Sequence, residues 1–176
     1  MGDVMFLKGL SPVVDCRCAV LFLAVFHADF LSAQYESNLV RNPGFESDIE
    51  SWKSQTPDRI QRIRYDSIEG DWSLAIEHGR PIQSTSVYNR VTTDASRGAF
   101  ELSINARSEI GFGSINLRIR VNGNAAAEHS RRYDLTGYTG WQKLALDFHS
   151  AEEVQSLAVI IDVEETSETT LIDHVV

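Results

Sequence analysis

The sequence predicts an all-β fold of antiparallel strands, either a sandwich or a barrel. After residue 34, apolar and polar residues alternate with a period of two, which is typical of strands with one buried and one exposed face. Turn-forming residues interrupt this alternation at fairly even spacing. No long segment has the periodicity of an amphipathic helix; only SAEEVQSLA, residues 150–158, could supply one helical turn.

Residues 1–33 differ from the rest and are predicted to be a signal peptide. Lys8 and Arg17 precede the apolar run CAVLFLAVF (18–26), which is too short to span a membrane but suits the core of a secretory signal. Cleavage is expected after Ala33, so that residues 34–176 form a secreted, extracytoplasmic domain. The alternative is a buried N-terminal helix.

Both cysteines of the chain, Cys16 and Cys18, lie in this leader. The mature domain would therefore contain no disulfide.

The alternation is clearest in the second half of the chain. In AFELSINAR (99–107), Phe100 and Leu102 alternate with Glu101 and Ser103. The other expected strands are VYNRV (87–91), SINLRIRVNGN (114–124), KLALDF (143–148), SLAVIIDVE (156–164) and TLIDHVV (170–176).

Turn signals separate the expected strands. Asn122-Gly123 between alternating residues is the strongest of them, because this dipeptide favours a tight hairpin. The remaining signals are Pro43-Gly44, Glu69-Gly70-Asp71, Arg97-Gly98 and Thr136-Gly137.

The charge balance excludes some partners. The chain carries 16 Lys and Arg against 25 Asp and Glu, a net charge of −9. Nucleic-acid binding requires basic side chains that neutralise phosphates, and docking on anionic membranes has the same requirement. We therefore expect a domain that binds neither nucleic acid nor an anionic membrane surface. We also expect the mature domain to be a monomer that is not inserted in a membrane.

Five motifs occur in a characteristic order along the chain. They are NLVRNPGFES followed by Trp52, GDWSLAI (70–76), GAFELSINARS (98–108), GWQKLALDF (140–148) and LIDHV (171–175). In this order and spacing, residues 38–176 resemble carbohydrate-binding modules of the family 4/9/16/22 type, within the galactose-binding-like group. The resemblance implies a two-sheet antiparallel jelly-roll sandwich that binds polysaccharides or oligosaccharides without catalysis, usually beside a glycoside hydrolase or lyase.

The same resemblance implies a structural Ca²⁺ between the first turn and the last strand. Carried over by position, its ligands are Glu46 and Asp173, with backbone carbonyls near Gly44 and Asp71. Calcium takes six to eight oxygen ligands, so such a cage is chemically reasonable. His174 stands where the family usually has a second Asp, and the alternative is that both carboxylates are solvated at strand ends.

Candidate sugar-binding residues lie at the polar positions of the expected strands. Arginine offers several donors in a fixed geometry, which suits sugar hydroxyls. If these strands share a sheet, their exposed faces would form a groove lined with Arg and Asn; the alternative is a merely solvated face. Asn89 and Arg118 also lie near positions that face the ligand in the resembled modules. The candidates are Tyr88, Asn89, Arg90, Asn105, Arg107, Arg118 and Arg120.

The four arginines of this set, on an otherwise acidic chain, suggest the kind of sugar. Arginine pairs bidentately with carboxylates, so a uronate or sulfated glycan is a hypothesis for the ligand.

Aromatic side chains could supply stacking platforms for sugar rings. Trp72 and Tyr133 are the candidates, with Tyr133 expected in a loop after two arginines, and Phe112 and Tyr138 remain as further ones; core or rim packing is the alternative. Trp52, Trp141 and Phe45 are read as core residues.

No catalytic motif is recognisable. The acidic residues lie mostly in turns and at strand ends, and the histidines show no metal-ligand or nucleophile pattern. We therefore expect a binding domain and no enzyme. Two alternatives stay open: a polysaccharide lyase or hydrolase on a jelly-roll scaffold, and a structural adhesion domain that binds protein.

Overall fold

The computed structural model describes residues 38–64, 66–77, 84–164 and 169–176, without the side chains of residues 94–96. The predicted signal peptide lies outside these ranges. The strands are β1 Lys53–Ser54, β2 Ile60–Arg64, β3 Trp72–Ile76, β4 Thr85–Ser108, β5 Ser114–Val121, β6 Glu128–Asp134, β7 Gln142–Glu164 and β8 Thr170–Asp173, with short 3₁₀ turns at Pro57–Arg59 and Ala125–Ala127. All strand pairs are antiparallel, which confirms the predicted all-β class.

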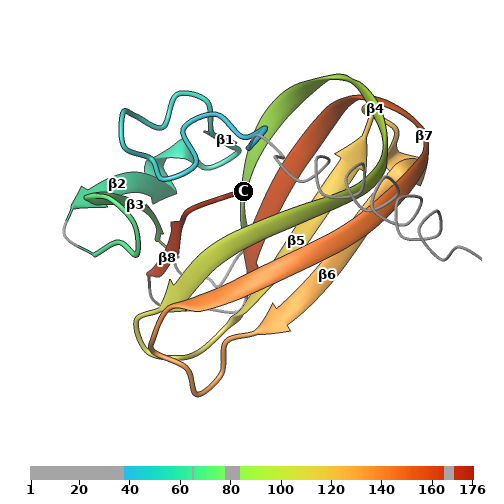
Figure 1. Cartoon of the computed structure of the whole chain (residues 1–176). Helices are drawn as coiled ribbons and strands as arrows, with labels where there is room; N and C mark the ends of the chain where they lie inside the picture. The colour runs from blue at the N-terminus through green and yellow to red at the C-terminus, as the bar shows by residue number, and fades with distance from the viewer. Residues whose placement is uncertain (1–37, 65, 78–83, 165–168) are drawn as a thin grey trace, which may run out of the picture. The chain divides into compact units, whose positions relative to one another are not determined.

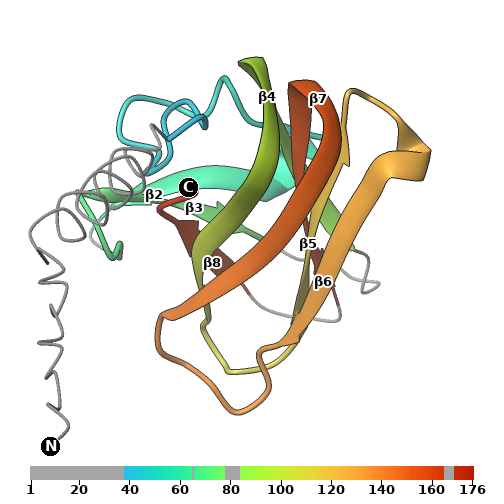
Figure 2. The same cartoon turned by 45° about the vertical axis from the view of Figure 1, so that its right-hand side comes forward.

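Two very long strands connect the two layers of the fold. β4 has 24 residues and β7 has 23, far more than the usual three to ten. They pair with each other along most of their length and curve together through the domain (Figure 1, Figure 2). The hydrogen-bonded order is β2-β3-β8-β4-β7-β5-β6, with β1 on β4.

Each layer uses one half of β4 and one half of β7. The first sheet contains β1, β4 from 85 to 92, β7 from 156 to 164, β5 and β6. The second sheet contains β2, β3, β8, β4 from 98 to 108 and β7 from 142 to 150. This arrangement confirms the jelly-roll sandwich.

The bends in β4 and β7 contradict two local predictions. Arg97-Gly98 is not a turn between strands; it lies within β4, where the register with β7 shifts between Thr92 and Gly98. Gly98 has a φ of 127°, so the strand changes direction at a residue without a side chain. Residues 150–158 form no helical turn, because the segment pairs with β4 and buries Val154.

One apolar core lies between the two sheets. Phe45 and Trp52 belong to this core, as predicted, and their ring centroids are 5.5 Å apart. Trp141, which was also predicted to be a core residue, is only partly buried. The inward residues of both sheets complete this core, among them Leu74, Ile104, Leu117 and Ile161. Each such side chain contributes about 1.5–3 kcal/mol on burial.

The two ends of the described chain lie against each other. Val175 N donates to Pro43 O at 2.9 Å, which joins the C-terminal end to the first turn. The last residue, Val176, also exchanges two backbone hydrogen bonds of 2.8 Å with Ser103 on β4. Asn38 Nδ2 donates to Val175 O at 3.1 Å. In the described ranges, no helix is long and apolar enough to cross a membrane.

Candidate functional site

The outer face of the first sheet carries two cross-strand rows of side chains. Tyr88 on β4 lies opposite Ile160 on β7, which lies opposite Arg118 on β5. Neighbouring strands are about 4.8 Å apart, so the Tyr88 and Arg118 positions are roughly 10 Å apart. The second row places Arg90, Ala158 and Arg120 in the same order.

Alternation in β4 shows that these rows face away from the core. Val87 and Val91 are buried, whereas Tyr88 and Arg90 are exposed. Four predicted site residues, Tyr88, Arg90, Arg118 and Arg120, therefore share one surface, which we call the outer face.

Two carboxylates hold the arginines of β5 in place. Asp162 on β7 accepts from Arg118 Nε at 2.5 Å and from Nη2 at 3.0 Å. Glu128 at the start of β6 accepts from Arg118 Nη1 at 3.1 Å and from Arg120 Nη2 at 2.8 Å. The Asp162 side chain is only 8% exposed, and Ser86 Oγ donates to it at 2.6 Å. The arginine guanidinium groups and their carboxylate partners are therefore both held in fixed positions.

Two members of the network, Arg118 and Glu128, have shifted pKa values that favour their charged forms. The hydrogen bond to Asp162 raises the pKa of Arg118 further above its ordinary value, and Glu128 adds to this effect. Hydrogen bonds from Arg120, and then from Arg118, hold the pKa of Glu128 below its ordinary 4.5. Guanidinium donors and carboxylate acceptors consequently lie side by side.

Other groups on the outer face have no such partners. Tyr88 is 42% exposed, and its cross-strand neighbour on β1 is the exposed Lys53. Within the described part of the chain, no ion pair or side-chain hydrogen bond involves Arg90. The tyrosine ring and two cationic side chains thus remain open to solvent.

Asn89 does not belong to this surface, contrary to prediction. It is 3% exposed and points inward with Val87 and Val91, because consecutive residues of a strand face opposite sides. Its Nδ2 is buried without a hydrogen-bond partner among the described residues.

Asn105, Arg107 and Trp72 belong to the second sheet, so the predicted single groove is wrong. β4 leaves the first sheet near Gly98, and its second half pairs with β8. Arg107 Nη1 forms an ion pair of 2.9 Å with Asp66. The guanidinium carbon of Arg62 lies 3.8 Å from the centroid of the Trp72 ring and covers one of its faces.

Tyr133 also lies elsewhere than predicted. It is on β6, not in a loop, and packs against the core. Its hydroxyl donates to Ala145 O and accepts from Ala145 N at 3.0 Å, so this phenol bridges β6 to β7. Its polar group is therefore already used by the backbone.

The predicted calcium ligands Glu46 and Asp173 come together from opposite ends of the domain. A Cβ on Gly44 would lie 3.6 Å from Asp173 Oδ1 and 3.8 Å from Glu46 Oε1. Asp173 is fully buried and accepts from the amides of Ile68 and Glu69 at 2.8 and 3.0 Å.

The donor set fits a calcium ion only in part. Glu46 Oε1 accepts from the amides of Asp71 and Trp72 at 3.1 Å each, while no hydrogen bond to Oε2 occurs among the described residues. His174 pairs with Glu69 instead of adding a carboxylate. In the described part of the chain, no group of three His, Cys, Asp or Glu side chains gathers around one point. An ion here would need carbonyl or water oxygens for most of its shell.

Two carboxylates of the outer face, Asp162 and Glu128, cannot be recognised from the sequence pattern. Asp162 shares the parity of Ala158 and Ile160, which made both faces of this strand look apolar. Glu128 opens a strand that the alternation did not reveal, since EHSRRYD contains few apolar residues. Only the cross-strand register brings these acids to the arginines.

Comparisons with known proteins show which solved structures share this fold. No family model matches the sequence, and no curated protein matches it significantly. Solved structures do match. TmCBM61, solved with beta-1,4-galactotriose, has 17% identity over 80% of this chain and 97% of its own, with a TM-score of 0.65.

Two further matched structures come from other families of carbohydrate-binding modules. A family 16 carbohydrate-binding module is 11% identical over 79% of this chain and 98% of its own, with a TM-score of 0.60. The CBM22-1 xylan-binding domain of Paenibacillus barcinonensis Xyn10C is 15% identical over 75% and 88%, with a TM-score of 0.53. The chain therefore has the jelly-roll fold of carbohydrate-binding modules, as the order of its motifs predicted.

Proposed function

We propose that this chain is a non-catalytic domain that binds a polysaccharide on the outer face of its first sheet. The observation that carries the proposal is the pair of cross-strand rows, Tyr88–Ile160–Arg118 and Arg90–Ala158–Arg120. The fold shared with modules that bind sugar chains supports it.

The chemistry of the outer face suits a sugar chain. The exposed Tyr88 ring offers an apolar surface for the C–H side of a sugar ring, and its hydroxyl remains at the edge. Arg118 and Arg120 supply fixed donors, while Asp162 and Glu128 supply acceptors. Ala158, between Arg90 and Arg120, is small enough to leave room above the sheet.

The ion pairs favour a neutral glycan over an anionic one. Two carboxylates offset the charges of Arg118 and Arg120, and Arg107 is paired on the second sheet. Among the residues that the structure describes, only Arg90 and Lys53 keep uncompensated charge beside Tyr88. Salt screens the attraction between opposite charges, so binding of an anionic glycan would weaken steeply as the salt concentration rises. A neutral glycan has no such attraction, and we therefore expect its affinity to change little with salt.

Retardation in affinity gels tests the function. We expect the protein to be slowed by at least one neutral β-linked polysaccharide cast in the gel, with similar retardation at low and high salt. A rise in absorbance from unsaturated product, on mixing with a uronate polymer, would instead identify a lyase. Retention only by uronate polymers and only at low salt would favour the anionic ligand. Failure with every polymer would contradict the proposal.

We also propose a calcium ion beside Glu46 and Asp173. The supporting observation is a fully buried carboxylate, Asp173, that has only backbone amides as partners among the described residues. Bound there, the ion would link the first turn to β8 through their own side chains. Export from the cell, through the predicted signal peptide, would place the domain among extracellular modules, whose calcium sites have dissociation constants of about 10⁻⁴–10⁻³ M.

A further inference from the structure

A pocket lies at the end of the outer face where β5 begins and β6 ends. It measures about 180 Å³ and is lined by Phe112, Gly113, Ser114, Arg132, Asp134 and Thr136. Ser114 is opposite Asp134 on β6 and opposite Glu164 on β7. Ser114 and Arg118 have the same parity on β5, so the pocket opens on the same side of the sheet as the arginine rows.

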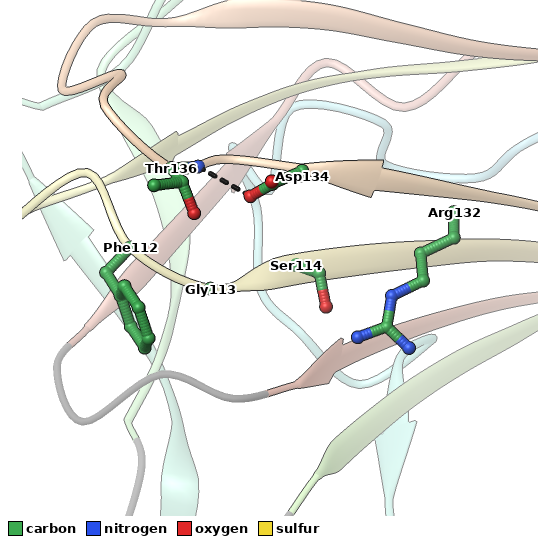
Figure 3. Close-up of a pocket in the computed structure, with 6 residues that line it drawn as sticks. All are labelled: Phe112, Gly113, Ser114, Arg132, Asp134 and Thr136. Carbon is green, nitrogen blue, oxygen red and sulfur yellow. Dashed lines mark hydrogen bonds between the residues drawn. The ribbon is translucent and has the colours of Figure 1, made fainter.

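The polar groups of the pocket include both donors and acceptors. Ser114 is 4% exposed, and its hydroxyl has no hydrogen-bond partner among the described residues. Figure 3 shows this hydroxyl and the Arg132 guanidinium pointing to the same side of β5 as the Phe112 ring. Asp134 Oδ1 accepts from the Thr136 amide at 2.8 Å, so this carboxylate is a fixed acceptor on the pocket wall.

Phe112 is an exposed aromatic ring on a tightly held loop. The ring side chain is 48% exposed. Ser108 Oγ contacts both the amide and the carbonyl of Phe112, at 3.1 and 3.0 Å. The loop is hydrogen-bonded to its neighbour through Leu135 N to Gly113 O and Gly137 N to Gly111 O. The backbone that carries this exposed ring is held firmly, so the ring is offered at a fixed place for stacking.

The pocket lies more than one sugar ring away from the arginine rows. Ser114 and Arg118 are four residues apart on one strand, which corresponds to about 13 Å. This span exceeds one sugar ring, so pocket and rows cannot hold the same residue of a glycan. A glycan chain that leaves the arginine rows along β5 would reach both.

We propose that this pocket is an additional subsite, which holds one sugar residue of the same glycan chain that binds the arginine rows. Phe112 stacks on that residue, and Ser114, Asp134 and Arg132 bond its hydroxyls. The inference rests on the proposed function. It assigns the direction in which the bound chain leaves the arginine rows, along β5, and predicts affinity that grows with chain length until the pocket is filled.

The test is isothermal titration with β-1,4-linked oligosaccharides from disaccharide to hexasaccharide. The series used is whichever of galacto-, xylo- or gluco-oligosaccharides corresponds to the polymer that retards the protein most. We expect the wild-type protein to bind the hexasaccharide more tightly than the disaccharide. Phe112→Ala should weaken the hexasaccharide by roughly tenfold, or about 1.4 kcal/mol, and leave the disaccharide unchanged.

Two further variants make the test specific. Asp134→Asn, at an exposed pocket residue, should reproduce a smaller part of the loss. Ile110→Ala is the matched control, because Ile110 is an exposed apolar residue of the same loop that does not line the pocket. It should bind every oligosaccharide as the wild type does.

The remaining outcomes overturn the inference in distinguishable ways. If Phe112→Ala binds the hexasaccharide as tightly as the wild type, the subsite is wrong while the proposed function stands. If it loses disaccharide and hexasaccharide equally, the pocket is the main site and not an additional one. If the wild-type protein binds no oligosaccharide and no polymer, the proposed function fails, and the subsite fails with it.

Discussion

Arg118 holds the polar network of the outer face together. Its guanidinium contacts both Asp162 and Glu128, and its side chain is 25% exposed. Removing one partner of a largely buried carboxylate leaves an unsatisfied acceptor, which is costly to the folded state. The residue should therefore affect stability as well as binding.

Replacement of Arg118 tests this double role. We expect Arg118→Ala to lower the free energy of unfolding by about 1–3 kcal/mol, because Asp162 loses its cationic partner. Arg90→Ala is the matched control on the same face, and we expect a change within about 0.5 kcal/mol. Urea denaturation measures both, and equal stabilities of the two variants would contradict the assigned network.

Because of Glu128, we expect the stability of the fold to depend on pH in the acid range. Its pKa is lowered in the folded state, so ionised Glu128 contributes stability above its ordinary value of 4.5, and this contribution is lost as the pH falls through the lowered pKa. We expect the free energy of unfolding to fall more steeply below pH 4.5 in the wild type than in Glu128→Gln. Parallel curves for the two proteins, from denaturation at a series of pH values, would show that this carboxylate is not coupled to folding.

The bend in β4 separates the two halves of the polar pattern. Alternation in the sequence predicts which residues of each segment face away from the core. Tyr88 and Arg90, which are exposed, and Arg118 and Arg120, which are half-buried on the same face, confirm it. It could not predict that one strand serves two sheets, because the bend at Gly98 looks like an ordinary turn in the sequence. Asn105 and Arg107 were therefore assigned to the wrong surface.

Gly98 provides a test of the bend. A residue with a side chain is strained at a φ of 127°, although no atom would lie within 4 Å of its Cβ. We expect Gly98→Ala to lower the free energy of unfolding by about 1–3 kcal/mol. Gly140→Ala, where a Cβ is equally unobstructed and φ is not positive, should change it little. Equal effects would mean that the backbone at Gly98 is not constrained.

Contacts between the two chain ends complete the domain. The segment from Asn38 to Phe45 meets Val175 through two hydrogen bonds among the described residues, and residues 34–176 contain no cysteine to support them. The sequence could suggest Glu46 and Asp173 as a pair only by resemblance to a family. Their actual partners, the amides of residues 68, 69, 71 and 72, depend on the loop that folds over β8.

Calcium should stabilise the whole molecule if it binds there. Calcium at a hundred times its dissociation constant would add about 2.7 kcal/mol to the free energy of unfolding. We expect a higher melting temperature in millimolar calcium than in EDTA, and no such difference for Glu46→Gln. A melting temperature of the wild type that is the same in both buffers would contradict the metal proposal and leave the sugar-binding proposal unchanged.

The outer face as a sugar-binding surface is the central claim, and Tyr88 tests it most directly. In affinity gels that contain the polymer retarding the wild type most, we expect Tyr88→Ala to lose most of its retardation. Ile68→Ala, an exposed apolar residue whose amide contacts Asp173 on the second sheet, should keep it. Undiminished retardation of Tyr88→Ala would contradict the account, because the ligand would then bind elsewhere on the domain.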